Sequence, residues 1–290
     1  MKLSQQKYNV MTVLNGGYFD FGRLFVNSFY DNIRLERVNK LYVFDTGLTQ
    51  MQRDYLGGFP SLEVVPTDLN TRHEVLHDKD WCRNVYSKTA FLLDVIKRDS
   101  LPAIMIDSDC LFVKSFFDLL PADSDFVACR REDKGAFSEY IASFFAVNSV
   151  EKASAFIEEW RDEMFYGTEN HKESPALTRL IYKSRYNVAA LPEDIISYTG
   201  TDINKDVRIV HMKSAAALRT VKQRIHQPHL SEYIQKYLTQ LPLFGAEQFL
   251  SKHPAETVAQ NSQSTLCESS SVKKLSAAQQ ALLIKRLKNI

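Results

Sequence analysis

Short apolar runs alternate with segments of helical periodicity along the chain from Tyr8 to Met212. The apolar runs predict strands at 8–14, 40–44, 61–65, 103–106, 125–129, 141–148 and 208–212. Between them, apolar residues recurring every three or four positions predict helices at 21–29, 81–97, 150–164 and 173–183. This order of strand, helix and strand predicts an α/β fold with a mostly parallel sheet and helices on both faces.

Polar or flexible residues follow several of the predicted strands. They are Asn15, Gly16 and Gly17 at the end of the first strand, Asp45 at the end of the second, and the triplet Asp107-Ser108-Asp109 after the run 103–106. Open α/β sheets bind ligands beyond the carboxyl ends of their strands. We therefore expect these residues to meet at one ligand site.

The acidic triplet is the most informative of these features. Two carboxylates at the end of a buried strand are costly unless a positive group meets them. If the strand continues, Asp107 and Asp109 share one face and Ser108 lies on the other. A hard cation such as Mg²⁺ or Mn²⁺, shared with substrate phosphates, suits such a pair. In the alternative interpretation, one aspartate caps the next turn and the other is solvated.

Composition narrows the class of protein only slightly. The net charge of +1, with no basic stripe carrying interleaved aromatics, gives no argument for nucleic acid as a partner. The 4 cysteines show no metal-binding spacing, and we expect free thiols. The N-terminal segment lacks the apolar stretch of a signal peptide, and no apolar run approaches the ~20 residues of a membrane span. We expect a cytoplasmic protein.

Several stretches resemble GT-A glycosyltransferases. The segment IMIDSDCLFVKSFFDLL is similar to their Asp-x-Asp passage, and TVLNGG before a helix resembles their first nucleotide-binding strand and loop. Lys88, in RNVYSKTAFLLDVI, takes the place of a basic residue that contacts the nucleotide or diphosphate. VHMK resembles the passage with a late metal-binding histidine and a nearby lysine on the diphosphate. The resemblance covers 8–213 and implies a GT-A fold.

A narrower similarity points to family 8, the glycogenin and lipopolysaccharide galactosyltransferase group. SFFAVN followed by a helix with Trp160, and KESPALTRLI followed by VAALPEDI, resemble two passages of that group. The chain departs from it where Glu173-Ser174 replaces Asp-Gln and where Lys213 follows His211 after one intervening residue. Membership of family 8 and the identity of the donor sugar stay open.

The resemblance implies a metal-dependent enzyme that transfers a sugar from a nucleotide-diphosphate sugar, expected to be a UDP-sugar, to a glycan or lipid-linked acceptor. Retention of configuration is slightly favoured, and a role in polysaccharide biosynthesis is expected. The implied ligands of Mn²⁺ or Mg²⁺ are Asp107, Asp109 and His211. The implied donor-binding residues are Leu14, Asn15, Gly16, Asp45, Lys88, Asp107, Ser108 and Lys213. Candidate catalytic residues are Glu173, Asp194 and Lys213, with Glu193 as a further carboxylate.

Each of these residues also has a plainer interpretation. His211 is compatible with a satisfied core histidine, Lys88 with a helical lysine that extends to solvent, and Asp45 with a cap. Glu173 is compatible with a first-turn acid that the helix dipole stabilises. Two other functions stay open: a nucleotidyltransferase that forms sugar nucleotides, and a non-catalytic sugar-nucleotide-binding protein. A HAD-type phosphatase is less favoured because its Asp-x-Asp pair normally follows the first strand.

The sequence changes character after Leu250. We predict a GT-A catalytic domain at 1–250, a flexible Ser-rich linker at 251–272 and a basic amphipathic helix at 273–290. The basic residues of that helix are Lys273, Lys274, Lys285, Arg286 and Lys288. They suit an anionic membrane surface, which places the enzyme at the inner face of a membrane. Packing on the catalytic domain or on another subunit is the alternative.

Overall fold

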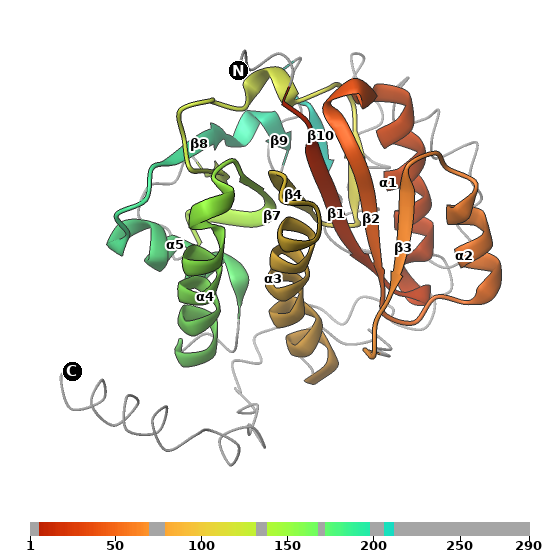
Figure 1. Ribbon diagram of the computed structural model, residues 1–290, viewed down its shortest axis with the longest axis horizontal. Coiled ribbons are helices and arrows are strands. Elements are labelled where there is room, and N and C mark those ends of the chain that lie inside the picture. The colour runs from red at the N-terminus through yellow and green to blue at the C-terminus, as the bar shows by residue number, and fades with distance from the viewer. Residues whose placement is uncertain (1–5, 70–78, 132–137, 168–171, 198–205, 212–290) are drawn as a thin grey trace, which may run out of the picture. The chain divides into compact units, whose positions relative to one another are not determined.

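The computed structural model describes residues 6–69, 79–131, 138–167, 172–197 and 206–211 (Figure 1). The chain divides into two compact units, Met1–Val258 and Ala259–Ile290. The second unit lies wholly outside the described residues, and so do the expected linker and terminal helix. Among the described helices, none combines the length and apolar character that a membrane span requires.

The main sheet has seven strands, with helices between them. The strands are β1 (Tyr8–Leu14), β2 (Val38–Asp45), β3 (Leu62–Pro66), β4 (Ala103–Ile106), β6 (Phe126–Arg130), β7 (Tyr140–Val147) and β8 (Val188–Pro192). The helices are α1 (Phe19–Asn32), α2 (Gln50–Gly57), α3 (Lys79–Asp99), α4 (Val150–Tyr166) and α5 (Glu173–Lys183). A smaller sheet contains β5 (Cys110–Phe112), β9 (Ile196–Ser197) and β10 (Ile209–His211).

The strand order of the main sheet is β3-β2-β1-β4-β7-β6-β8. Strands β3, β2, β1 and β4 pair in parallel, β7 is antiparallel to both β4 and β6, and β6 pairs in parallel with β8. The expected mostly parallel α/β sheet is thus confirmed. The order turns back at β1, which lies between β2 and β4. In such sheets the loops that leave adjacent strands at this point diverge and open a ligand-binding crevice.

Two hydrophobic cores cover the two faces of the sheet (Figure 1). Side chains alternate between the faces of a strand, so Ile104 and Ile106 of β4 lie in one core and Met105 in the other. The first core also holds Phe25 and Phe29 of α1, together with residues of α2 and of the small sheet. The second core holds buried side chains of α3, α4 and α5. Helices therefore pack on both faces, as the sequence pattern predicts.

The structure departs from the sequence pattern in several places, and the short strands β5 and β9 were not predicted either. Helix α2 was not predicted because Leu56 is its only buried residue, although a capping box between Thr49 and Gln52 marks its start. Strand β8 was not predicted as a strand, since only one of its five residues is buried. The run expected to be a strand at 208–212 does form β10, but in the small sheet rather than the main one.

Candidate functional site

The acidic triplet lies in a turn and not in a strand. Strand β4 ends at Ile106, and β5 begins at Cys110. The Asp107 backbone N–H donates to the Ser143 carbonyl at 3.0 Å, and the Cys110 N–H returns to the Asp107 carbonyl at 3.2 Å. The expected strand-like alternation of the two aspartates is therefore wrong. Because the backbone turns at Ser108, the carboxylates of Asp107 and Asp109 can both face the same side chain.

That group is the imidazole of His211. Its Nε2 lies 3.2 Å from Asp109 Oδ1 and 3.8 Å from Asp107 Oδ2. The small sheet sets this geometry, because β10 is antiparallel to β5 and His211 is paired directly with Cys110. The three side chains expected to hold a metal thus lie together, although about a hundred residues separate the histidine from the aspartates.

Lys88 meets the same carboxylates from α3. Its Nζ lies 2.6 Å from Asp107 Oδ1 and 3.0 Å from Glu173 Oε1, and its side chain is 13% exposed. The positive partner that a buried acidic pair requires is therefore present in the protein itself. The sequence indicated Lys88 as a diphosphate contact, but it did not predict the ion pairs with Asp107 and Glu173.

Helix α5 brings Glu173 to this cluster. Beyond the end of β4, the backbone N–H groups of Ala142 and Tyr140 in β7 donate to Ser174 Oγ and Thr178 Oγ1, both at 3.0 Å. Residues four apart share a helix face, so one face of α5 runs along β7. The Glu173 carbonyl also accepts from Trp160 Nε1 of α4 at 3.1 Å. These contacts fix the first turn of α5 beside Asp107.

Burial and neighbouring charges set the protonation of the cluster. Burial raises the pKa of Glu173 to about 7, although Lys88 opposes the shift. Burial lowers the pKa of Lys88, but Asp107 and Glu173 outweigh it, so its pKa is raised and the ammonium stays charged. For His211 burial likewise lowers the pKa, but Asp109 and Asp107 raise it above its ordinary value.

The charge and donor set of the cluster fit a divalent cation. Among the described residues, two aspartates and a partly ionised glutamate face the ammonium of Lys88 and the imidazole of His211, so carboxylates are in surplus over ammonium groups. Ligand atoms of Asp109, Cys110 and His211 all lie within 4.8 Å of one another. Burial raises the pKa of Cys110 well above its ordinary value, so its thiol keeps its proton. Carboxylate oxygens and imidazole nitrogen remain as donors, a set that suits Mn²⁺.

The loop after β1 lies close to the acidic pair through Tyr18. Asn15 Oδ1 accepts the Tyr18 N–H at 2.9 Å and caps the 3₁₀ turn Gly16–Tyr18. Burial raises the pKa of Tyr18, and the charges of Asp109 and Asp107 add to the shift. Tyr18 is therefore a neighbour of the acidic pair. Tyr18 was not among the predicted site residues, although its place directly after the Asn-Gly-Gly turn was a signal that it lies at the ligand edge.

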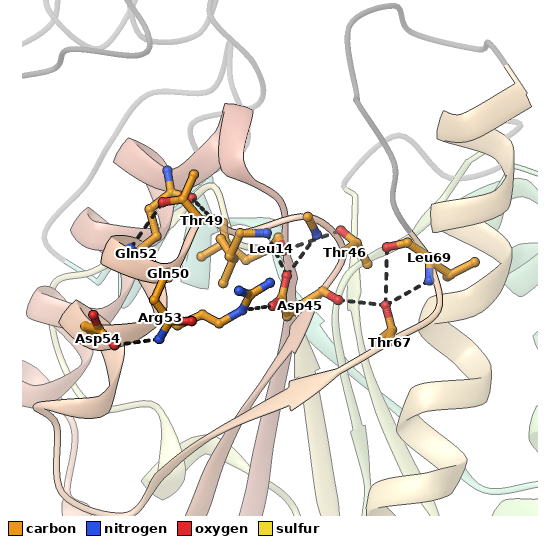
Figure 2. Close-up of polar contacts among 12 residues, drawn as sticks. Leu14, Asp45, Thr46, Thr49, Gln50, Gln52, Arg53, Asp54, Thr67 and Leu69 are labelled. Atoms are coloured by element: carbon orange, nitrogen blue, oxygen red, sulfur yellow. Dashed lines mark hydrogen bonds and ion pairs between the residues drawn. The ribbon is translucent and has the colours of Figure 1, made fainter.

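Asp45 lies at the same edge but in a different network (Figure 2). Its Oδ1 accepts the N–H groups of Gly47 and Leu48 at 2.8 and 2.7 Å, and Oδ2 pairs with Arg53 Nε at 2.6 Å. The side chain is 3% exposed. Protein groups thus engage both carboxylate oxygens of Asp45, as the capping interpretation expects, and its role in nucleotide binding stays a prediction.

The remaining candidates are only partly described. Glu193 is buried in the 3₁₀ turn that follows β8. Asp194 belongs to the same turn, and its side chain lies outside the described residues, as does all of Lys213. Their expected roles stay predictions.

The chain matches a known protein family. The nucleotide-diphospho-sugar transferase family matches residues 45–222, more than half of the chain. The chain belongs to this family. The matched segment carries Lys88, the acidic turn, Glu173 and His211.

A solved structure shows the same fold. The apo structure of WbbM, a bifunctional glycosyltransferase, aligns with a TM-score of 0.52 at 13% identity, over 76% of this chain and 44% of that chain. The match thus spans less than half of WbbM and supports a glycosyltransferase-like fold. A search of curated proteins gave no significant match. Family 8 is not confirmed by these comparisons.

Proposed function

We propose that the protein is a metal-dependent glycosyltransferase that uses a nucleotide-diphosphate sugar, with a UDP-sugar as the expected donor. One observation carries the proposal. Asp107, Asp109, His211, Lys88 and Glu173 converge within ion-pair distance at the carboxyl edge of the sheet, and they come from four separate places: the acidic turn, α3, α5 and β10. That edge, beside the point where the strand order turns back, is where such sheets bind ligands.

Asp109 and His211, with Asp107 assisting, would hold Mn²⁺ or Mg²⁺. The cation would supply charge that offsets the negative charge developing on the diphosphate as the sugar leaves. The surplus of carboxylates over ammonium groups supports this assignment, since the cluster has more negative charge than Lys88 alone neutralises.

The other side chains take roles that follow from charge and place. Lys88 and Lys213 bind the diphosphate, and Leu14, Asn15 and Gly16, with Ser108 in the acidic turn, line the nucleotide side of the crevice. Glu173 and Asp194 are the carboxylates for the sugar hydroxyls or the reacting carbon. A buried carboxyl whose pKa is about 7 holds or releases a proton near neutral pH, which suits such a role for Glu173.

The acceptor in this proposal is a glycan or a lipid-linked glycan, and the configuration at the transferred sugar is retained. The family match supports an acceptor and a nucleotide-sugar donor in general terms. The identity of both substrates needs a direct assay.

A panel of nucleotide sugars tests the proposal. The full chain is incubated with each donor and Mn²⁺, and released nucleoside diphosphate is measured with and without a chelator. Asp109→Ala and the isosteric Asp109→Asn should abolish metal-dependent release, while circular dichroism and thermal melting show an intact fold.

Three outcomes would contradict the proposal. Full activity in both Asp109 variants, or activity that ignores the chelator, removes the metal site. Release of pyrophosphate from a nucleoside triphosphate and a sugar phosphate would identify a nucleotidyltransferase instead. Tight nucleotide-sugar binding with no turnover across glycan acceptors would identify a binding protein.

A further inference from the structure

The carboxylate of Asp45 organises a tight loop after β2. It accepts the backbone N–H groups of Gly47 and Leu48, and it pairs with Arg53, whose side chain is 41% exposed (Figure 2). The Asp45 carbonyl accepts from Thr67 Oγ1 at 2.7 Å. Gly47 has a φ of 132°, a conformation that side chains rarely adopt. Asp45 thus fixes a backbone path that glycine adopts readily and other residues rarely do.

This loop is bonded directly to the loop after β1. The Thr46 N–H donates to the Leu14 carbonyl at 3.1 Å, and the Gly16 N–H donates to the Gly47 carbonyl at 3.2 Å. Gln52 Nε2 of α2 donates to the Gly16 carbonyl at 3.3 Å. The approach is so close that a Cβ on Gly16 would lie 2.9 Å from the Gly47 carbonyl oxygen. The two loops therefore hold each other in place.

We infer that Asp45 is a positioning residue for the nucleotide-binding loop and does not itself contact the nucleotide. The inference rests on the proposed function and deepens it. Asp45 acts through a continuous chain of contacts, in which its carboxylate fixes Gly47 and the Gly47 carbonyl fixes Gly16. The carboxylate is 3% exposed and already accepts two N–H groups and an ion pair, so little of it is open to a ligand. Its removal would free the loop that lines the crevice beside Tyr18 and the acidic pair.

Two measurements on the full chain test this inference. Hydrogen exchange of the segment 14–18 reports the order of the loop without any ligand. Calorimetric binding of UDP, GDP, ADP and CDP with Mn²⁺ reports the donor site. Asp45→Ala should speed exchange at 14–18 and weaken binding of the preferred nucleotide by roughly tenfold or more, because buried hydrogen bonds to a charged group are lost. Asp45→Asn keeps an acceptor oxygen for the loop and should restore part of both properties.

A double-variant cycle of Asp45→Ala with Gly16→Ala separates positioning from direct contact by Asp45. Gly16→Ala changes a residue of the nucleotide loop itself. It disturbs the same loop contact from the other side, so it should reproduce the loss of affinity with Asp45 intact. Because both residues act through the Gly47 contact, the double variant should bind nucleotide about as well as the weaker single variant. Gly57→Ala is the matched glycine control, since nothing lies within 4 Å of its Cβ position.

Asp125→Ala is the matched carboxylate control. Asp125 also accepts a backbone N–H, that of Asn187 at 3.0 Å, and pairs with Lys152 at 2.7 Å. It precedes β6 and so lies at the amino end of that strand, away from the carboxyl ends where the site is. It should leave exchange at 14–18 and nucleotide affinity unchanged.

Each contrary outcome has a distinct meaning. Unchanged exchange at 14–18 in Asp45→Ala overturns the coupling of the loops. Additive effects in the double variant mean that Asp45 contacts the nucleotide itself. A loosened loop with full nucleotide affinity overturns the positioning role and leaves the proposed function standing. A wild-type protein that binds none of the four nucleotides overturns the proposed function and the inference together.

Discussion

Replacement of Lys88 by methionine tests the electrostatics of the site most directly. Methionine keeps most of the length of the side chain and removes the charge that pairs with Asp107 and Glu173 at 2.6 and 3.0 Å. Removing one partner of a buried ion pair costs about 3–5 kcal/mol, because the remaining charge stays buried without compensation. Each kcal/mol lowers the melting temperature of a domain of this size by about 2–4 °C, so a decrease of roughly 6–20 °C follows.

Near neutral pH, the decrease in melting temperature of Lys88→Met should fall in the lower part of that range. Glu173 has a pKa of about 7 with Lys88 present. Without the ammonium its pKa rises further, so the carboxyl takes up a proton and relieves part of the cost. The loss of stability should therefore grow as the pH rises above 7, where Glu173 is more often ionised. Thermal melting of wild type and variant across that range measures this trend.

A divalent cation should compensate for the missing ammonium. Lys88→Met leaves the acidic cluster more negative, so Mn²⁺ should bind it more tightly and raise its melting temperature more than that of the wild type. Lys152→Met is the matched control, because Lys152 pairs with Asp125 at 2.7 Å but is 46% exposed. Such a surface pair contributes at most about 1 kcal/mol. Equal melting temperatures of the two variants, or equal stabilisation by Mn²⁺, would refute the reasoning.

Three further predictions follow from the same charges and from the terminal segment. Because the pKa of His211 is raised, protons compete with Mn²⁺ for its imidazole, so Mn²⁺ should bind more tightly and release protons as the pH rises through that pKa. Calorimetry in two buffers measures the affinity and the proton release. Binding of Mn²⁺ that does not depend on pH would contradict this prediction. For Glu173 the folded pKa of about 7 lies above its ordinary value, so its contribution to stability is present below the ordinary pKa and is lost as the pH rises through about 7. Glu173→Gln should flatten that decline in urea unfolding, and an unchanged pH profile would exclude it. Deletion after Ser270 should abolish salt-sensitive sedimentation with anionic liposomes; binding that survives the deletion, or that the intact chain never shows, excludes the membrane role.

Most of the fold follows from local pattern. Strand β1 and helix α5 have the predicted bounds, because the first is a mostly apolar run and the second has a clear helical period. Helix α2 and strand β8 escaped prediction because few of their residues are buried, and β5 escaped because it is only three residues long. The pairing of β10 with β5 in a separate sheet was also not predictable, since no local signal specifies which strand a short apolar run will join.

The site divides in the same way. Asp107, Asp109 and His211 were predicted as a group, and they lie together. The ion pairs of Lys88 were not predicted, because they depend on where α5 lies relative to α3, which is a tertiary property. Sequence spacing gives the side chains that one element carries. It does not give the distance between two elements.

Polar side chains on the helices bond to unpaired strand backbone, and these bonds determine how far apart the elements of the site lie. Strand β5 has a free edge, and α1 covers it: Ser28 Oγ accepts the Phe112 N–H and Asn32 Nδ2 donates to the Phe112 carbonyl, both at 3.0 Å. Because His211 lies on the strand paired with β5, these two contacts on α1 set its position. Ser174 and Thr178 cover in the same manner the part of β7 that extends beyond the end of β4, and they set the position of Glu173. Backbone groups beyond the end of a strand must find partners, and here the helices that satisfy them determine where the histidine and the glutamate of the site lie.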